Sequence, residues 1–266
     1  MKVLSQNISL LGRLVLWPCR LLPQWLTAFG HFFTFIAKSF WISFTSRPRW
    51  SVIIDQMRFI GVSSFFIVFL TSAFTGMVIA LQTGRAFALF QAETLTGAVT
   101  AISLSRELAP VLTALMITAR AGSAMAAQLG TMKVTEQIDA LSTMAVDPMG
   151  YLVTPRVIAA VLMMPVLTGL FDFIGMWGGY LVGVGLLGID QATFMEKVRY
   201  YMHVPYIVEG LFKSLFFGAL LSSISCYMGF HARGGAAGVG RVTTRAVVIS
   251  SVSILVADYF LTALLF

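Results

Sequence analysis

Two adjacent charged residues, Arg106 and Glu107, lie in the middle of an apolar stretch of the sequence. A charged side chain that faces lipid costs on the order of 3 kcal/mol. Neighbouring residues point about 100° apart on a helix, so these two do not simply face each other. The residues three and four positions away from each are uncharged. We therefore expect their partners on another helix, on another subunit, in water or in a ligand.

Pro110 follows these charges and adds a polar backbone group to them. Proline has no N–H to donate to the carbonyl four residues earlier, which is that of Arg106. Such backbone is tolerated at membrane depth only where protein buries it or where it lines a wet cavity. The combination favours a polar cavity for a substrate or for conduction. The alternative is a buried ion pair that only fixes helix packing.

Three other ionisable residues, Arg120, Asp172 and Asp258, also fall within apolar stretches. Arg120 is a possible partner for either aspartate. The two aspartates could instead form a proton path, or each could serve packing alone, because a sequence gives no distances.

A short amphipathic helix is predicted over residues 134–144, in a loop between two apolar stretches. Its apolar strip is formed by Val134, Ile138 and Leu141. Its polar surface is formed by Glu136, Gln137 and Asp139. Such a helix could rest on the bilayer, but acidic side chains are poorly suited to an anionic leaflet. Docking to another protein is therefore favoured.

Helices in a membrane must position these residues, because 58% of the 266 residues are hydrophobic and only 11% are charged. A soluble domain has roughly a quarter of its residues charged. Five apolar stretches are long enough to cross the hydrocarbon core, and they cover residues 59–82, 94–132, 157–188, 206–230 and 246–266. As one helix the second would be about 58 Å long, nearly twice the core, so it must bend, break or project. The sequence predicts an all-α membrane protein.

The N-terminal region is expected to lie on the membrane rather than across it. Residues 24–44 place His31 and Lys38 on one helical face, opposite a face of Trp and Phe side chains, which is typical of an interfacial helix. The preceding residues show the same pattern more weakly. The expected organisation is interfacial helices over residues 1–50 and a five-span domain over residues 51–266.

The distribution of Lys and Arg sets the expected orientation. Twelve lie in residues 1–58, 130–156 and 231–245, against three in the loops 83–95 and 189–204. The N-terminus and the 134–144 helix are therefore expected in the cytoplasm, and the C-terminus outside. Because the basic residues cluster at the ends of apolar stretches, the net charge of +7 indicates topology and not nucleic-acid binding.

No sequence motif indicates a catalytic or nucleotide site, since HExxH, GxSxG and a Walker lysine are all missing. Cys19 and Cys226 lie far apart without CxxC spacing, so we expect neither a disulfide nor a metal site. The glycine-rich residues 234–240 are expected to form a loose loop. Glycines that repeat every four residues from Gly175 to Gly183 form a bare strip for helix packing. We expect no catalytic residue and no cofactor in this chain.

Residues 104–159, LSRELAPVLTALMITARAGSAMAAQLGTMKVTEQIDALSTMAVDPMGYLVTPRVIA, closely resemble the signature of the MlaE permease family. Its members are the membrane subunits of bacterial ABC transporters that work with MCE proteins. The resemblance extends to the plan of an interfacial N-terminal helix and five spans. It implies a permease homodimer, two cytoplasmic ATPase subunits that bind the ATP, often a small STAS-domain protein, and a periplasmic MCE hexamer. The implied cargo is phospholipid, moved between the inner and outer membranes.

The resemblance also implies roles for particular residues. The family's short cytoplasmic helix couples the permease to the ATPase, and its counterparts here are Glu136, Gln137, Ile138, Asp139, Leu141 and Met144. The family's lipid cavity lies between the two permeases, which places near the lipid Phe74, Met77, Val78, Leu81, Gln82, Arg106, Glu107 and Leu108. Gln128 stands where many members have glutamate, which puts a role for a charge there in doubt.

The residues themselves fit this function, because Arg106 could bind phosphate while Phe and Met side chains contact acyl chains. A chain without a nucleotide site also requires an energised partner. The alternative is a stand-alone proton- or ion-coupled carrier that uses Glu107, Asp172 and Asp258 as its relay. We expect the chain in the bacterial inner membrane.

Overall fold

The computed structural model describes residues 30, 32–39, 41–42 and 49–265. Within this part of the chain there is no strand, and five helical runs are long and apolar enough to cross a membrane. They are Trp50–Ala88, Glu93–Val134, Met149–Gly185, Val204–Phe230 and Gly235–Leu265. The predicted all-α membrane fold with five spans is confirmed.

The first run consists of α2 (Trp50–Ile60) and α3 (Phe65–Ala88), joined by a 3-10 turn at Val62–Ser64. The change of helix type follows Gly61, where α2 packs closely on the third run. A Cβ atom added to Gly61 would lie 2.2 Å from the terminal methyl of Met163. Only glycine allows this approach without a shift of the methionine.

The second run keeps its helical path over 42 residues instead of breaking at Pro110. It consists of α4 (Thr96–Ser103), α5 (Ala109–Ile117) and α6 (Ser123–Val134), joined by π-helical turns at Leu104–Leu108 and Thr118–Gly122. A π turn places hydrogen bonds between residues five apart and so accommodates the missing N–H of a proline. At 1.5 Å per residue the run is about 63 Å long, so it projects from the hydrocarbon core.

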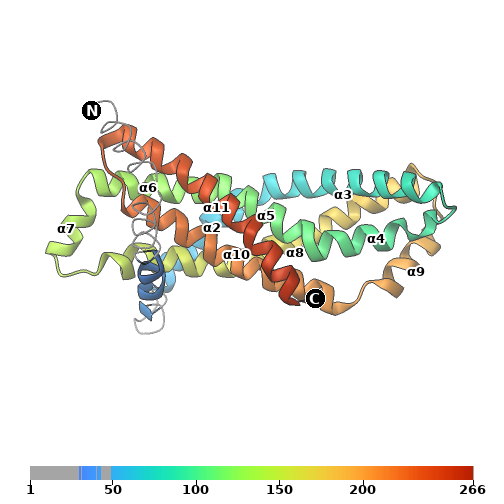
Figure 1. Ribbon diagram of the computed structural model, residues 1–266, viewed down its shortest axis with the longest axis horizontal. Helices are drawn as coiled ribbons and strands as arrows, with labels where there is room; N and C mark the ends of the chain where they lie inside the picture. The colour runs from blue at the N-terminus through green and yellow to red at the C-terminus, as the bar shows by residue number, and fades with distance from the viewer. Residues whose placement is uncertain (1–29, 31, 40, 43–48, 266) are drawn as a thin grey trace, which may run out of the picture.

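The remaining helices are α7 (Gln137–Thr143), α8 (Thr154–Gly185), α9 (Gln191–Tyr201), α10 (Val204–Phe230) and α11 (Gly235–Leu265), with a π turn at Met149–Val153 before α8. Figure 1 shows α7 at one end of the long axis, and the α3–α4 connection with α9 at the other end. The two sets of connections are therefore separated by the full length of the bundle.

The prediction of a loose loop over residues 234–240 was wrong, because α11 already begins at Gly235. Gly234 and Gly235 have φ angles of 89° and 65°, which supply the sharp turn after α10. Gly238 is buried, and a Cβ atom there would lie 1.9 Å from the carbonyl oxygen of Arg233. The glycines here allow a tight helix start rather than flexibility.

Part of the predicted 24–44 helix is described, and residues 30, 32–39 and 41–42 are helical. In Figure 1 this segment, drawn in blue, crosses the long axis of the bundle. The Phe35 side chain is buried, with its ring 5.4 Å from that of Tyr227 and 5.9 Å from that of Phe230. The weaker amphipathic stretch before residue 24 lies outside the described residues, as does Cys19.

Small residues bring α3 and α8 into backbone contact. A Cβ atom added to Gly76 would lie 1.8 Å from the carbonyl oxygen of Gly175, and one added to Gly178 would lie 2.4 Å from that of Ala73. Such approach is the usual way in which membrane helices gain packing energy without a hydrophobic driving force. Part of the predicted glycine strip on α8 thus serves helix packing.

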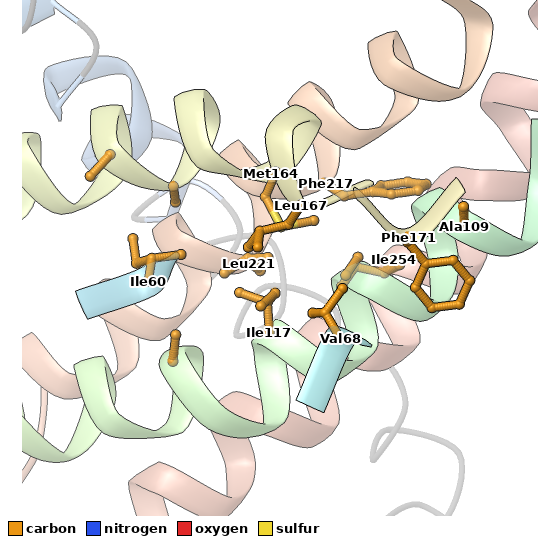
Figure 2. Close-up of a cluster of buried hydrophobic side chains, with 14 of the residues drawn as sticks. Ile60, Val68, Ala109, Ile117, Met164, Leu167, Phe171, Phe217, Leu221 and Ile254 are labelled. Atoms are coloured by element: carbon orange, nitrogen blue, oxygen red, sulfur yellow. The ribbon is translucent and has the colours of Figure 1, made fainter. Parts of the chain in front are cut away.

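The largest apolar cluster joins the central helices. Figure 2 shows Ile117 of α5, Phe171 of α8 and Phe217 of α10 among its members, with Ile254 of α11 beside them. All four side chains are fully buried. The cluster therefore fixes α5, α8, α10 and α11 relative to one another.

Candidate functional site

A buried lysine on α10 forms the centre of a polar cluster inside the bundle. The Lys213 side chain is 2% exposed, and its ammonium group lies 2.7 Å from a carboxylate oxygen of Glu107 and 3.5 Å from one of Asp258. It also donates hydrogen bonds to Thr262 Oγ1 at 2.7 Å and to the carbonyl oxygen of Arg106 at 3.2 Å. One cation thus joins groups from the second, fourth and fifth spans.

The carbonyl of Arg106 is the backbone acceptor that the position of Pro110 leaves without its usual helical donor. Lys213 supplies a donor from another helix, so the π turn at Leu104–Leu108 is stabilised from outside its own helix. Sequence reasoning missed this role for Lys213. The available signal was a lysine four residues after Glu209 in a span that is apolar elsewhere, since charges inside a span need buried partners.

Arg106 points to a different part of α10 from Glu107. Its Nε atom lies 3.0 Å from a carboxylate oxygen of Glu209, and its guanidinium lies 5.3 Å from the centre of the Tyr206 ring. The side chains of Arg106 and Glu209 are 17% and 23% exposed, so this pair is more accessible than Lys213. The structure therefore supplies separate partners from α10 for the two adjacent charges.

The proposed pairing of Arg120 with an aspartate is not found. Arg120 instead donates to the carbonyl oxygen of Phe59 and, at 3.2 Å, to the hydroxyl of Ser64, and its guanidinium lies 4.6 Å from the centre of the Phe59 ring. These contacts bind the second span to the junction of α2 and α3. Arg120 stands in the π turn at Thr118–Gly122, and its side chain faces the first span rather than either aspartate.

Asp172 stands apart from the cluster. It is 8% exposed and interacts with the Ser105 side chain, and it forms no ion pair with any described residue. Asp258, in contrast, lies against Lys213. The relay proposed for Glu107, Asp172 and Asp258 is therefore joined in the structure only between Glu107 and Asp258, through the lysine.

The residues expected on α3 near the lipid occupy its outer surface. Phe74 and Val78 are 59% and 49% exposed, Gln82 is exposed, and Met77 and Leu81 are partly buried. Glu107 turns toward α10 and α11, and Leu108 packs on the apolar core. Within one chain, these α3 residues therefore form a mainly apolar outer surface that is separate from Glu107.

The predicted helix over residues 134–144 is shorter than expected, because α7 spans only Gln137–Thr143. Glu136 adopts a left-handed conformation with φ of 61°. The chain changes direction at this residue, between the end of α6 at Val134 and the start of α7 at Gln137. Lys133 Nζ lies 2.7 Å from a carboxylate oxygen of Asp139 and fixes this corner.

Only part of α7 is available to another protein. Ile138 is 2% exposed and packs in the same apolar cluster as Leu129 and Met149, so it anchors α7 to its own chain. Glu136, Gln137, Asp139 and Met144 are exposed, and Leu141 is partly buried. The exposed surface is therefore acidic and polar, with Met144 as its large apolar side chain.

Gln128 accepts a hydrogen bond from Nη2 of Arg156 at 3.4 Å. Arg156 is 8% exposed and also donates through Nη1 to the carbonyl oxygen of Leu152 at 2.6 Å. The amide oxygen of glutamine thus gives this buried arginine a neutral acceptor. The position works as a contact between α6 and α8 without a negative charge.

This arrangement combines five runs that are long and apolar enough to cross a membrane, a short exposed helix between the second and third, and a charged cluster that joins the second, fourth and fifth. A family described as Permease MlaE matches residues 53–264, which include all of these features. The chain belongs to the MlaE permease family. The match spans most of the first run and all of the next three, and it ends one residue before α11 does.

Curated relatives agree with this membership of the MlaE permease family. A probable ABC transporter permease protein of Rickettsia typhi is 46% identical over 88% of this chain and 90% of its own length. The intermembrane phospholipid transport system permease protein MlaE of Haemophilus influenzae is 41% identical over 83% of this chain and 85% of its own length. The chloroplastic protein trigalactosyldiacylglycerol 1 of Arabidopsis thaliana is 41% identical over 83% of this chain and 63% of its own length.

Proposed function

We propose that this chain is the membrane permease subunit of an ABC transporter that moves phospholipids between the inner and outer membranes of a bacterium. Membership of the MlaE permease family and the name of the Haemophilus influenzae relative support this function. The observation that carries it is the partly exposed Arg106–Glu209 pair beside the buried Lys213 cluster. Charges held at this depth suit the headgroup of an amphiphile whose tails remain in apolar surroundings.

In this function Arg106 contacts the lipid phosphate, because a guanidinium binds phosphate oxygens by charge-assisted hydrogen bonds. Glu209 and the Tyr206 ring position the guanidinium. Lys213 holds Glu107 and Asp258 in place behind it. The exposed side chains Phe74 and Val78 of α3 would contact acyl chains in a cavity completed by a second copy of the permease.

The energy would come from a separate cytoplasmic ATPase that binds the ATP. The exposed acids of α7, Glu136 and Asp139, are the surface on which it would press. The complete assembly would hold two permeases, two ATPases, a periplasmic MCE hexamer and a STAS-domain protein. In the inner membrane, the α7 end would face the cytoplasm and the C-terminus the periplasm, as the distribution of Lys and Arg indicates.

A proton-coupled carrier is the second candidate, and one observation favours it. The cluster holds two cations, Arg106 and Lys213, against the three carboxylates of Glu107, Glu209 and Asp258. A protonated carboxyl group would balance this excess. Against this candidate, Asp172 interacts with Ser105 and forms no ion pair with the charged residues of the cluster within the described part of the chain.

Arg106→Ala is expected to lower the amount of phospholipid that co-purifies with the chain by about tenfold, because one charge-assisted contact to phosphate is lost. Arg106→Lys should retain part of it, since the charge remains. Mass spectrometry of the extracted protein measures the bound lipid. Arg85→Ala, at an exposed site at the end of α3, is the matched control.

Unchanged bound phospholipid in Arg106→Ala would contradict the proposed headgroup contact. Arg106 would then serve helix packing through Glu209 alone.

A further inference from the structure

A groove outside the charged cluster lies between α9 and the first turns of α10. Its volume is about 600 Å³. Most of its lining is apolar and includes Met195, Val198, Met202 and Ile207. Two charged side chains, Glu196 and Arg199, also line it. None of the proposed roles above uses these residues.

The helix that forms one wall of this groove is firmly held. Asp190 caps α9 by accepting hydrogen bonds from Thr193, at 2.9 Å from the backbone N–H and 3.0 Å from the hydroxyl. The backbone hydrogen bond from Thr193, followed by the bond from its side chain, lowers the pKa of Asp190. Phe194 is 1% exposed, and Cβ atoms added to Gly97 or Gly183 would lie 2.8 Å or 2.6 Å from its ring. The groove is therefore a feature of packed helices.

Helix α9, which forms one wall of the groove, lies at the end of the bundle opposite α7, as does the α3–α4 connection (Figure 1). Tyr200 and Tyr201 close α9, and Val204 and Val208 at the start of α10 are 72% and 56% exposed. Tyrosine beside exposed aliphatic side chains is typical of the interface between headgroups and hydrocarbon. The groove is thus placed where phospholipid molecules are the surrounding solvent.

The charges in the groove form no ion pair with the described part of the chain. No ion pair within 4 Å joins Glu196 or Arg199 to each other or to any other described residue. They stand three residues apart on α9, about one helical turn. A cation and an anion at this spacing beside an apolar wall are complementary to the phosphate and the ammonium of a zwitterionic headgroup.

A second groove, of about 300 Å³, adjoins the first. It lies between α8 and α9 and shares Met195 and Val198 with the first groove. Phe173 and Trp177 on its other wall are 74% and 61% exposed. Apolar lining therefore extends from the charged pair on α9 along the surface of α8 into the hydrocarbon depth of the bundle.

We infer that this groove binds a phospholipid, with its phosphate on Arg199, its ammonium near Glu196 and its acyl chains along Met195, Met202 and Ile207. The inference rests on the proposed function for its purpose, as a station on the lipid's path. Ile207 lies next to Tyr206 and two residues before Glu209, and both of these hold Arg106. The same turns of α10 therefore form the wall of the groove and the support of the Arg106 site.

The test is lipid binding to the purified full-length chain, delipidated in detergent and titrated with phosphatidylethanolamine in native mass spectrometry. Arg199→Gln should weaken binding of one lipid about tenfold, and Arg199→Lys should retain most of it. Arg85→Gln removes an exposed arginine at the same end of the bundle and should change nothing. Glu196→Gln should weaken phosphatidylethanolamine but not phosphatidylglycerol, whose headgroup has no ammonium.

Equal lipid affinity of Arg199→Gln and the unmodified chain would overturn the inference. If Arg106→Ala still lost a lipid in the same titration, the proposed function would stand without this groove. If neither variant lost a lipid, both proposals would fail. Unchanged lipid binding together with loss of a co-purifying membrane protein would assign the groove to a protein contact and likewise overturn the inference. An unchanged unfolding temperature of Arg199→Gln shows that its fold is intact.

Discussion

Lys213→Met is expected to destabilise the folded chain by about 1–3 kcal/mol, because the partly exposed acceptors around the buried ammonium group lose their donor. Two carboxylates, Glu107 and Asp258, depend on this one ammonium group, which is 2% exposed. The carbonyl of Arg106 and the hydroxyl of Thr262 would lose the same donor. Denaturant or thermal unfolding of the purified protein in detergent measures the loss.

Two further variants make this prediction specific to the cluster. Lys197→Met removes a partly buried lysine from α9, and should change stability by no more than about 0.5 kcal/mol. The triple variant Lys213→Met, Glu107→Gln, Asp258→Asn removes all three charges, and should recover most of the loss. If Lys213→Met unfolded like the unmodified chain, the central place of this lysine would be refuted.

Charge reversal on α7 is expected to abolish association with the ATPase and therefore ATP-driven lipid transport. Glu136→Lys combined with Asp139→Lys replaces the exposed acids with cations. A partner surface that is complementary to acids is basic and would repel these cations. Insertion into the membrane should be unaffected, because both side chains lie outside the spans. Co-purification of the ATPase with the tagged permease provides the measurement.

Controls separate the partner surface from the fold of α7. Asp139→Asn removes the ion pair with Lys133 without reversing charge, and should retain the ATPase. Glu93→Lys reverses an exposed acid at the opposite end of the bundle, and should also retain it. Normal co-purification of the Glu136→Lys, Asp139→Lys variant would count against a coupling role for α7.

The sequence predicted the five spans and the need of Arg106 and Glu107 for partners elsewhere, because both follow from the cost of charges in hydrocarbon. It did not predict which residues meet them. Contact between helices depends on their relative depth and rotation, and a hydropathy pattern contains neither quantity. Arg120 illustrates this limit, since its partners Phe59 and Ser64 lie on another span, 61 and 56 positions earlier in the sequence.

The errors in the connections have a different cause. Glycine-rich sequence usually indicates a loop. Here Gly234 and Gly235 instead form a sharp turn with positive φ angles, and Gly238 allows the backbone of Arg233 to pack against α11. The left-handed conformation of Glu136 shortens the predicted helix over residues 134–144. A non-glycine residue carries little sequence signal for that conformation, because such residues seldom adopt it.

The most direct test of the proposed function is reconstitution of the full-length chain in liposomes that contain labelled phospholipid. With its ATPase subunit and ATP, the permease is predicted to transfer label to an acceptor. Alone, it is predicted to transfer none, with or without a proton gradient across the membrane. Transfer by the chain alone, driven by a proton gradient, would contradict the account and identify a proton-coupled carrier.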